Sequence, residues 1–140
     1  MSQTDFKDKE VIDIGCGSGI LTVYASELGA KHITALDIDS RAVDNTKQNC
    51  ERNQVSNTDA YWLDFMQTDL KADIILANLP RESILMCMPK IRESLNDNGI
   101  AIISRYKEVP EDDLLKGWTI QQHFVGEVYD SYILKKGETT

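Results

Sequence analysis

The sequence predicts an α/β fold in which helices cover a doubly wound, mostly parallel sheet. Short apolar runs alternate with segments of helical periodicity through most of the chain. A glycine-rich bend follows the first apolar run, and two strand-like runs end the chain with no helix between them. The last two runs predict an antiparallel C-terminal hairpin at the sheet edge, which completes a Rossmann-like sheet of seven strands. With 140 residues, we expect one domain over residues 1–140.

The first half of the chain is predicted to alternate strand and helix twice. Glu10–Ile14 is the first strand, and a helical pattern begins at Ser18 and ends at Gly29. The second strand is His32–Asp37, and Ser40 is expected to cap the next helix. The expected buried faces consist of Ile20, Leu21, Tyr24, Ala25 and Leu28 in the first helix and Val43, Thr46 and Cys50 in the second.

The second half continues the alternation. We predict strands at Asp59–Leu63 and Ala72–Ala77, then helix over Glu82–Leu95, with a kink or a junction of two short helices at Pro89. The remaining predicted elements are a turn at Asn96–Gly99, a strand at Ile100–Ser104, a short helix from Glu111 to near Gly117, and hairpin strands at Trp118–Val125 and Glu127–Leu134 around Gly126.

Composition restricts the class of protein. The formal net charge of −8 disfavours nucleic acid as a partner, because such binding depends on clustered lysine and arginine. Cys16, Cys50 and Cys87 form no CxxC pair, so neither a disulfide framework nor a metal site is expected. No apolar run is long enough to cross a bilayer. We therefore expect a cytoplasmic protein without membrane association.

The glycine-rich bend predicts a bound small molecule that carries no phosphate. Gly15, Gly17 and Gly19 give GxGxG, whereas the dinucleotide fingerprint requires GxGxxG or GxGxxA. The phosphate loop of nucleoside triphosphatases needs a lysine that is missing here. A nicotinamide-linked oxidoreductase is therefore disfavoured. Asp13 lies before the bend, where a carboxylate favours a cation, and Asp37 ends the second strand, where it can accept hydrogen bonds from a ribose.

These segments resemble a known family. VIDIGCGSGIL (residues 11–21) and ALDID (residues 35–39) resemble the first two motifs of class I S-adenosylmethionine-dependent methyltransferases. AVDNTKQNCERNQV and DIILANLP are most similar to the catalytic domain of the ribosomal protein L11 methyltransferase family. The resemblance covers Val11 to Ser104 and implies S-adenosylmethionine as the cofactor.

The resemblance also implies roles for individual residues. The loop from Gly15 to Gly19 would wrap the cofactor, Asp13 would order the loop and the amino group, and Asp37 would hold the ribose. Ile38 would pack on the adenine face, and Asp64 and the backbone of Phe65 would meet the adenine edge. Asp59 or Asp69 could replace Asp64 in this role if the third strand is misplaced by a few residues. The implied cofactor-binding residues are Asp13, Gly15, Cys16, Gly17, Gly19, Asp37, Ile38, Asp64, Phe65 and Asn78.

Methyl transfer needs alignment of the nucleophile more than it needs acid, base or metal. Asn78 follows the fourth strand, which in this fold ends beside the transferable methyl group, and its side-chain oxygen can accept a hydrogen bond from an acceptor N–H. Asn78 is therefore the candidate catalytic residue.

The methyl acceptor is expected to be a protein nitrogen. Methyltransferases of planar amides and bases carry Asn-Pro-Pro-aromatic, whereas this chain has Leu79 and Arg81, which makes a nucleic-acid acceptor the weaker alternative. Only ten residues precede Val11, so a partner subunit or a homodimer is expected to complete the site. The other alternative is a non-catalytic module that binds S-adenosylmethionine and transfers nothing.

Overall fold

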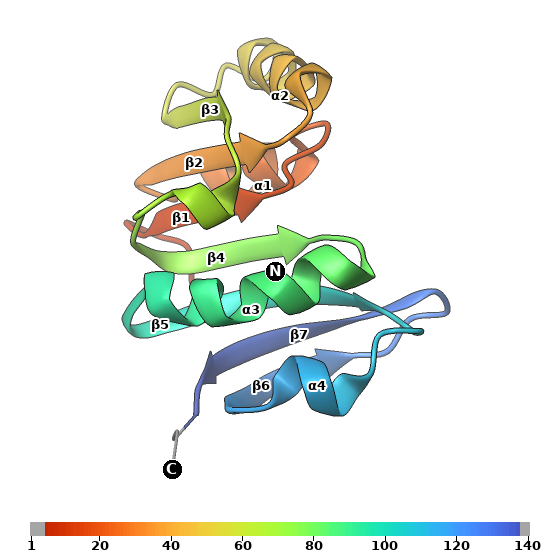
Figure 1. Ribbon diagram of the computed structural model, residues 1–140. Coiled ribbons are helices and arrows are strands. Elements are labelled where there is room, and N and C mark those ends of the chain that lie inside the picture. The colour runs from red at the N-terminus through yellow and green to blue at the C-terminus, as the bar shows by residue number, and fades with distance from the viewer. Residues whose placement is uncertain (1–4, 138–140) are drawn as a thin grey trace.

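The computed structural model describes residues 5–137, and in this range seven strands form one sheet in the order β3-β2-β1-β4-β5-β7-β6 (Figure 1). Only β7 runs antiparallel to its neighbours within that range, so the predicted fold class is confirmed. The elements are β1 (Glu10–Ile14), α1 (Ile20–Glu27), β2 (His32–Asp37), α2 (Ser40–Arg52), β3 (Thr58–Trp62), the 3-10 helix η1 (Phe65–Gln67), β4 (Ala72–Asn78), α3 (Arg81–Ser94), β5 (Leu95–Tyr106), α4 (Glu111–Leu115), β6 (Trp118–Phe124) and β7 (Tyr129–Lys136).

The strand order reverses between β1 and β4. Ile14 at the end of β1 pairs with Leu36 of β2 on one side and with Ala77 of β4 on the other. In an open parallel sheet, the crevice beyond the strand ends at such a reversal is where ligands bind. The loop after β1 and the residue that ends β4, Asn78, therefore lie at this crevice.

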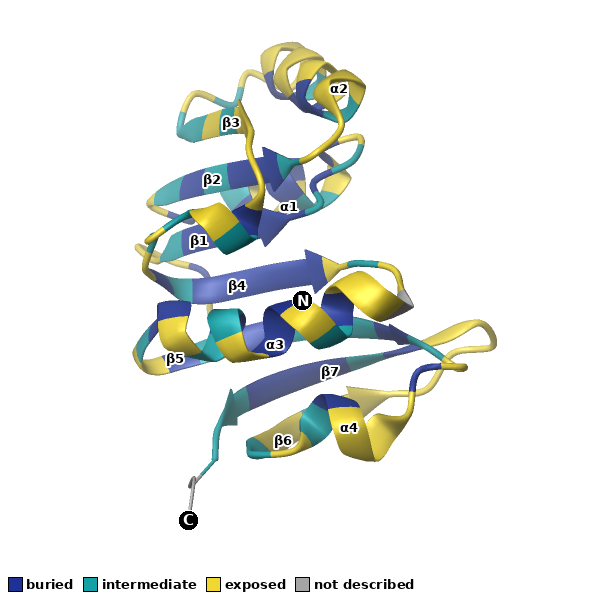
Figure 2. Ribbon diagram, in the orientation of Figure 1, coloured by how far each residue is buried: buried dark blue, intermediate teal, exposed yellow. Residues whose placement is uncertain are grey.

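Two apolar clusters pack on opposite faces of the sheet. Ile75, Ile103 and Tyr132 join residues of α3 and α4 in one cluster, on the face that is toward the viewer in Figure 1. Val11 and Leu76 point the other way and pack with Ala25 of α1, because successive side chains in a strand alternate between faces. Figure 2 shows β1, β4 and β7 buried through most of their length, whereas the turn between β6 and β7 is exposed.

Two details of the predicted helices are wrong. Ile20 and Tyr24 are 70% and 37% exposed, whereas α1 buries the predicted Ala25 together with Thr22 and Val23. Gly19 has a left-handed backbone conformation, so the helix begins at Ile20. The face of the helix that carries Ile20 and Tyr24 points outward. Asp39, and not Ser40, caps α2, because Asp39 has the extended backbone of a cap and its carboxylate accepts from the Arg41 amide.

Several strand bounds and the course of α3 also differ from the prediction, for example β7, which begins at Tyr129 and not at Glu127. β3 begins one residue earlier, at Thr58, and exposes Trp62, because an edge strand has one neighbour only. α3 continues through the exposed Pro89 as one helix, so two short helices are excluded. The predicted turn at residues 96–99 lies inside β5 as an irregularity in the pairing with β4, where Asn98 adopts a positive φ of 65°. Within the described range, no helix has the length and apolar character needed to span a membrane.

Candidate active site at the ends of β1 and β4

The glycines of the loop after β1 all have positive φ, but their surroundings differ. A Cβ on Gly19 would lie 2.9 Å from the Thr46 Cα, and one on Gly15 would lie 2.6 Å from a methyl carbon of Leu79. Packing against the backbone therefore forbids a side chain at Gly19, whereas at Gly15 the positive φ disfavours one and the Leu79 side chain would have to move. A Cβ on Gly17 would meet only the Gly15 carbonyl oxygen, at 4.0 Å. Gly17 is thus where the bare backbone faces open space that a ligand can occupy.

Four amides of the loop are already hydrogen bonded within the protein. The amides of Gly15 and Cys16 donate to the Leu36 carbonyl oxygen at 2.8 and 3.0 Å. The Gly17 amide donates to Asp37 Oδ2 at 3.1 Å, and the Gly19 amide donates to the Cys16 carbonyl oxygen at 2.9 Å. A phosphate cradle requires free amides at this position. The geometry therefore supports the prediction of a ligand without phosphate.

Helix α2 fixes the outer side of the loop. The Thr46 hydroxyl lies 3.1 Å from the Gly17 carbonyl oxygen, and the Asn49 side-chain amide donates to the Ser18 carbonyl oxygen. The sequence predicted Thr46 on the buried face of this helix. Its hydrogen bond to the loop depends on a tertiary contact that the sequence pattern does not indicate. Burial raises the pKa of the Cys16 thiol to about 11, which disfavours the nucleophilic thiolate form.

Asp13 lies beneath the loop and is only 1% exposed. Its carboxylate accepts a hydrogen bond from the Thr22 hydroxyl at 2.7 Å, which ties β1 to α1. Burial raises the Asp13 pKa to about 7, the bond from Thr22 opposes this rise, and the nearby Asp37 adds to it. Asp13 forms no ion pair within residues 5–137 and lines neither of the cavities described next.

A cavity of about 430 Å³ opens between the ends of β2 and β4, and we call it the β2-side cavity. Asp37 stands at its wall and has lone pairs left after accepting from the Gly17 and Asp39 amides. The predicted site residues that line this cavity are Gly15, Asp37, Ile38, Asp64, Phe65 and Asn78. Sequence reasoning missed apolar lining residues, among them Leu63, Leu79 and Met86.

The structure also discriminates among the three candidate acids that follow β2. Asp64 caps η1, accepts from the Met66 amide at 3.0 Å and lines the β2-side cavity. Asp59 pairs with His32 at 2.8 Å, and Asp69 lies 3.8 Å from the Lys90 ammonium. Neither Asp59 nor Asp69 lines the cavity, so the geometry favours Asp64.

A second cavity, of about 550 Å³, lies on the other side of the loop. We call it the β5-side groove. Gly15 and Asn78 line both cavities, so the two spaces meet at these residues. Cys16 and Gly17 also line the groove, and so do Ser104, Ser131, Phe124 and Tyr129, for which no role was predicted.

The sequence matches the family described as Ribosomal protein L11 methyltransferase (PrmA) over residues 1–130. The chain belongs to this family. Ribosomal protein L11 methyltransferases of Shewanella baltica strain OS195 and Shewanella sediminis are 40% and 44% identical over 122 and 114 residues, which cover 84% and 80% of this chain. The same matches cover 42% and 39% of those proteins, so the chain spans about two fifths of their length.

Solved structures agree with the family assignment. Ribosomal protein L11 methylase from Lactobacillus delbrueckii subsp. bulgaricus has a TM-score of 0.87 and 27% identity, covering 94% of this chain and 72% of that chain. An RNA methyltransferase from Salinibacter ruber, crystallised with S-adenosyl-L-homocysteine, has a TM-score of 0.82, covering 99% of this chain and 88% of that chain. At 15% identity, the second likeness shows the fold alone.

In this member of the L11 methyltransferase family, most predicted site residues come together around the junction of the two cavities. Gly19, at the end of the loop, packs against Thr46, and Asp13 lies beneath the loop, and neither residue lines a cavity. The side chain of Arg81 lies outside the described part of the structure.

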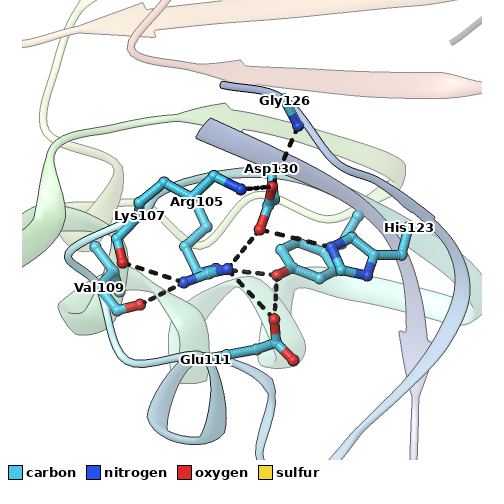
Figure 3. Close-up of polar contacts among 8 residues, drawn as sticks. Arg105, Lys107, Val109, Glu111, His123, Gly126 and Asp130 are labelled. Carbon is cyan, nitrogen blue, oxygen red and sulfur yellow. Dashed lines mark hydrogen bonds and ion pairs between the residues drawn. The ribbon is translucent and has the colours of Figure 1, made fainter. Parts of the chain in front are cut away.

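A charged network, missed by sequence reasoning, lies at the same end of the sheet (Figure 3). The Asp130 carboxylate of β7 accepts hydrogen bonds from Arg105 Nη2 at 2.5 Å and from Lys107 Nζ at 2.6 Å. The Tyr132 hydroxyl donates to Glu111 at 2.8 Å and accepts from Arg105 Nε at 2.9 Å. The bond from Lys107, reinforced by those from Gly126 and Arg105, holds the Asp130 pKa well below its usual range. These side chains satisfy one another and tie β5, β7 and α4 together.

Proposed function

We propose that this domain binds S-adenosylmethionine and transfers its methyl group to a nitrogen atom of a protein. The observation that carries the proposal is the junction of two cavities at Gly15 and Asn78. One cavity has the acid and apolar walls that a nucleoside requires, and the other opens beside the candidate catalytic Asn78. A donor and an acceptor can therefore meet end to end at one position.

The residues present fit the proposed cofactor. Asp37 can accept from ribose hydroxyls, while Ile38 and Phe65 offer apolar surface to a base ring. About 430 Å³ lies within the usual range of small-molecule sites. The amides of Gly15, Cys16, Gly17 and Gly19 are occupied, which disfavours a phosphate, and the Asp37 carboxylate at the cavity wall favours a cationic ligand. When bound, S-adenosylmethionine supplies an electrophilic methyl group on a sulfonium.

Asn78 is the proposed catalytic residue. It ends β4, is exposed, and stands where both cavities meet. Its amide oxygen can accept an acceptor N–H and so aim the nitrogen lone pair. No metal is required, because the step needs orientation of the nucleophile and exclusion of water.

The proposed acceptor class follows from the family. The curated relatives are named for ribosomal protein L11, which makes that protein the first acceptor to test. The net charge of −8 makes nucleic acid the weaker alternative. We also propose that the domain acts in the cytoplasm, and that a partner subunit or a second copy of the domain completes the site.

The direct test is incubation with methyl-labelled S-adenosylmethionine and purified ribosomal protein L11. We expect label in L11 with the wild type and with the control Asn45→Ala, whose side chain lies exposed on α2. Asn78→Ala should lower the rate by about 100-fold, because the lone pair loses its orientation. If the domain binds S-adenosylhomocysteine but labels no L11, the result would favour the non-catalytic module. If it binds neither S-adenosylmethionine nor S-adenosylhomocysteine, the result would contradict the proposal.

A further inference from the structure

Four neighbouring strands place a row of side chains beside Asn78. Asn78 of β4 pairs in register with Ser104 of β5, Ser104 with Ser131 of β7, and Ser131 with Phe124 of β6. Residues paired in this way project from the same face of the sheet, and adjacent strands lie about 4.8 Å apart. All four residues line the β5-side groove. The row therefore leads from Asn78 across the sheet over roughly 14 Å.

The rest of the groove is apolar and aromatic. One pleat below the row, Leu76, Ile102 and Ile133 are likewise in register and form its floor. One pleat above it, Tyr129 pairs with Tyr106, and their rings meet edge to face at 6.1 Å. Tyr129 and Phe124 are each 47% exposed and stand at the rim. The groove thus combines an apolar floor, a row of amide and hydroxyl groups, and an aromatic rim.

No charged side chain is among the described residues that line the groove. Arg105 directly follows Ser104 in β5, and Asp130 directly precedes Ser131 in β7. Both charged side chains therefore project from the opposite face of these strands, where they bind each other. An amine that enters uncharged surroundings favours its neutral form, because burial penalises the ammonium. Serine hydroxyl and asparagine amide oxygens can accept hydrogen bonds from that neutral amine. Only the neutral amine has the lone pair that methyl transfer needs.

We propose that the β5-side groove binds the methyl acceptor as a neutral amine on an apolar stem, with Ser104 sharing the nitrogen with Asn78. Ser131, Phe124 and Tyr129 line the path of the stem. This inference rests on the proposed function. The nitrogen lone pair forms the new N–C bond while the electron pair of the S–C bond returns to sulfur, and the methylated ammonium then gives a proton to water.

Binding of a simple probe tests the groove without any methyl transfer. The domain, with and without S-adenosylhomocysteine, is titrated with n-butylamine at pH 8 and pH 9 while backbone amide signals are followed by NMR. We expect shifts at Ser104 and Ser131 and about tenfold tighter apparent binding at pH 9, because the neutral fraction of an amine with a lysine-like pKa rises tenfold. The permanent cation n-butyltrimethylammonium should leave these signals unchanged.

Two variants sharpen this test. Ser131→Tyr fills the groove and should abolish n-butylamine binding, and Ser104→Ala should weaken it about tenfold, while the exposed control Ser56→Ala changes nothing. All three should bind S-adenosylhomocysteine as the wild type does. Equal binding of the permanent cation, absence of the pH effect, or shifts elsewhere would overturn the groove assignment. If the wild type does not bind S-adenosylhomocysteine, that result would instead overturn the proposed function.

Discussion

Two buried aspartates near the carboxyl end of the sheet have opposite surroundings. Asp13, beneath the glycine loop, is 1% exposed, and its one side-chain hydrogen bond comes from a hydroxyl. Asp130, in the hairpin, is 3% exposed and forms ion pairs with Arg105 and Lys107. Burial therefore raises the Asp13 pKa to about 7, whereas its partners lower the Asp130 pKa.

The difference distinguishes an acid whose charge is compensated from a buried acid whose charge is not. The charge of Asp130 is balanced by cations of the same chain, so it needs nothing from outside. Asp13 has no such partner, so burial and the nearby Asp37 favour its protonated form. Variants at the two aspartates should therefore fail in different ways.

The largest effect on stability is expected from Asp130→Asn. This change removes the nearest counter-charge of the buried Arg105, which keeps only the longer contact with Glu111, so the melting temperature should fall by roughly 10–20 °C. The melting temperature is read by circular dichroism, and S-adenosylhomocysteine binding is measured below the transition. A stable variant that has lost binding would reverse the roles assigned to the two regions.

Asp13→Asn should act on pH dependence. A folded-state pKa raised from 3.8 to about 7 favours the protonated form, so the contribution of Asp13 to stability is greatest below pH 4 and is lost as pH rises through 7. The wild-type unfolding free energy should fall by up to about 1.4 kcal/mol per pH unit in that window. The asparagine side chain can still accept the hydrogen bond from Thr22. Because it does not titrate, the variant should lack this fall of the unfolding free energy with pH.

Urea unfolding at pH 5, 6 and 7 measures this slope. Asp44→Asn, at an exposed acid of α2 outside both cavities, serves as the matched control and should keep the wild-type slope. Parallel curves for the wild type and Asp13→Asn would show that Asp13 is ionised in the folded protein at all three values.

The smallest effect is expected from Glu111→Gln. Glu111 is exposed and lies 3.3 Å from Arg105, and glutamine can still accept from the Tyr132 hydroxyl. The melting temperature should change by less than about 3 °C, because exposed ion pairs contribute little. A fall as large as that of Asp130→Asn would mean that the network depends on both acids equally.

The sequence was sufficient for the fold class and for the loop, because strand alternation and glycine spacing are local patterns. It placed the start of β3 one residue late, since an exposed edge strand lacks a clear apolar pattern. It could not join Asn78 to Ser104 and Ser131, or Arg105 to Asp130. Those relations depend on strand register between segments more than twenty residues apart.

We propose that the loop and Asp37 form the binding site of a nucleoside ligand. Calorimetric titration with S-adenosylhomocysteine of the wild type, Asp37→Asn and the control Asp59→Asn tests it most directly. We predict equal affinity for the wild type and Asp59→Asn, and binding weaker by at least about tenfold for Asp37→Asn, which loses charge-assisted hydrogen bonds. Equal binding by all three proteins, or no binding by the wild type, would contradict the account.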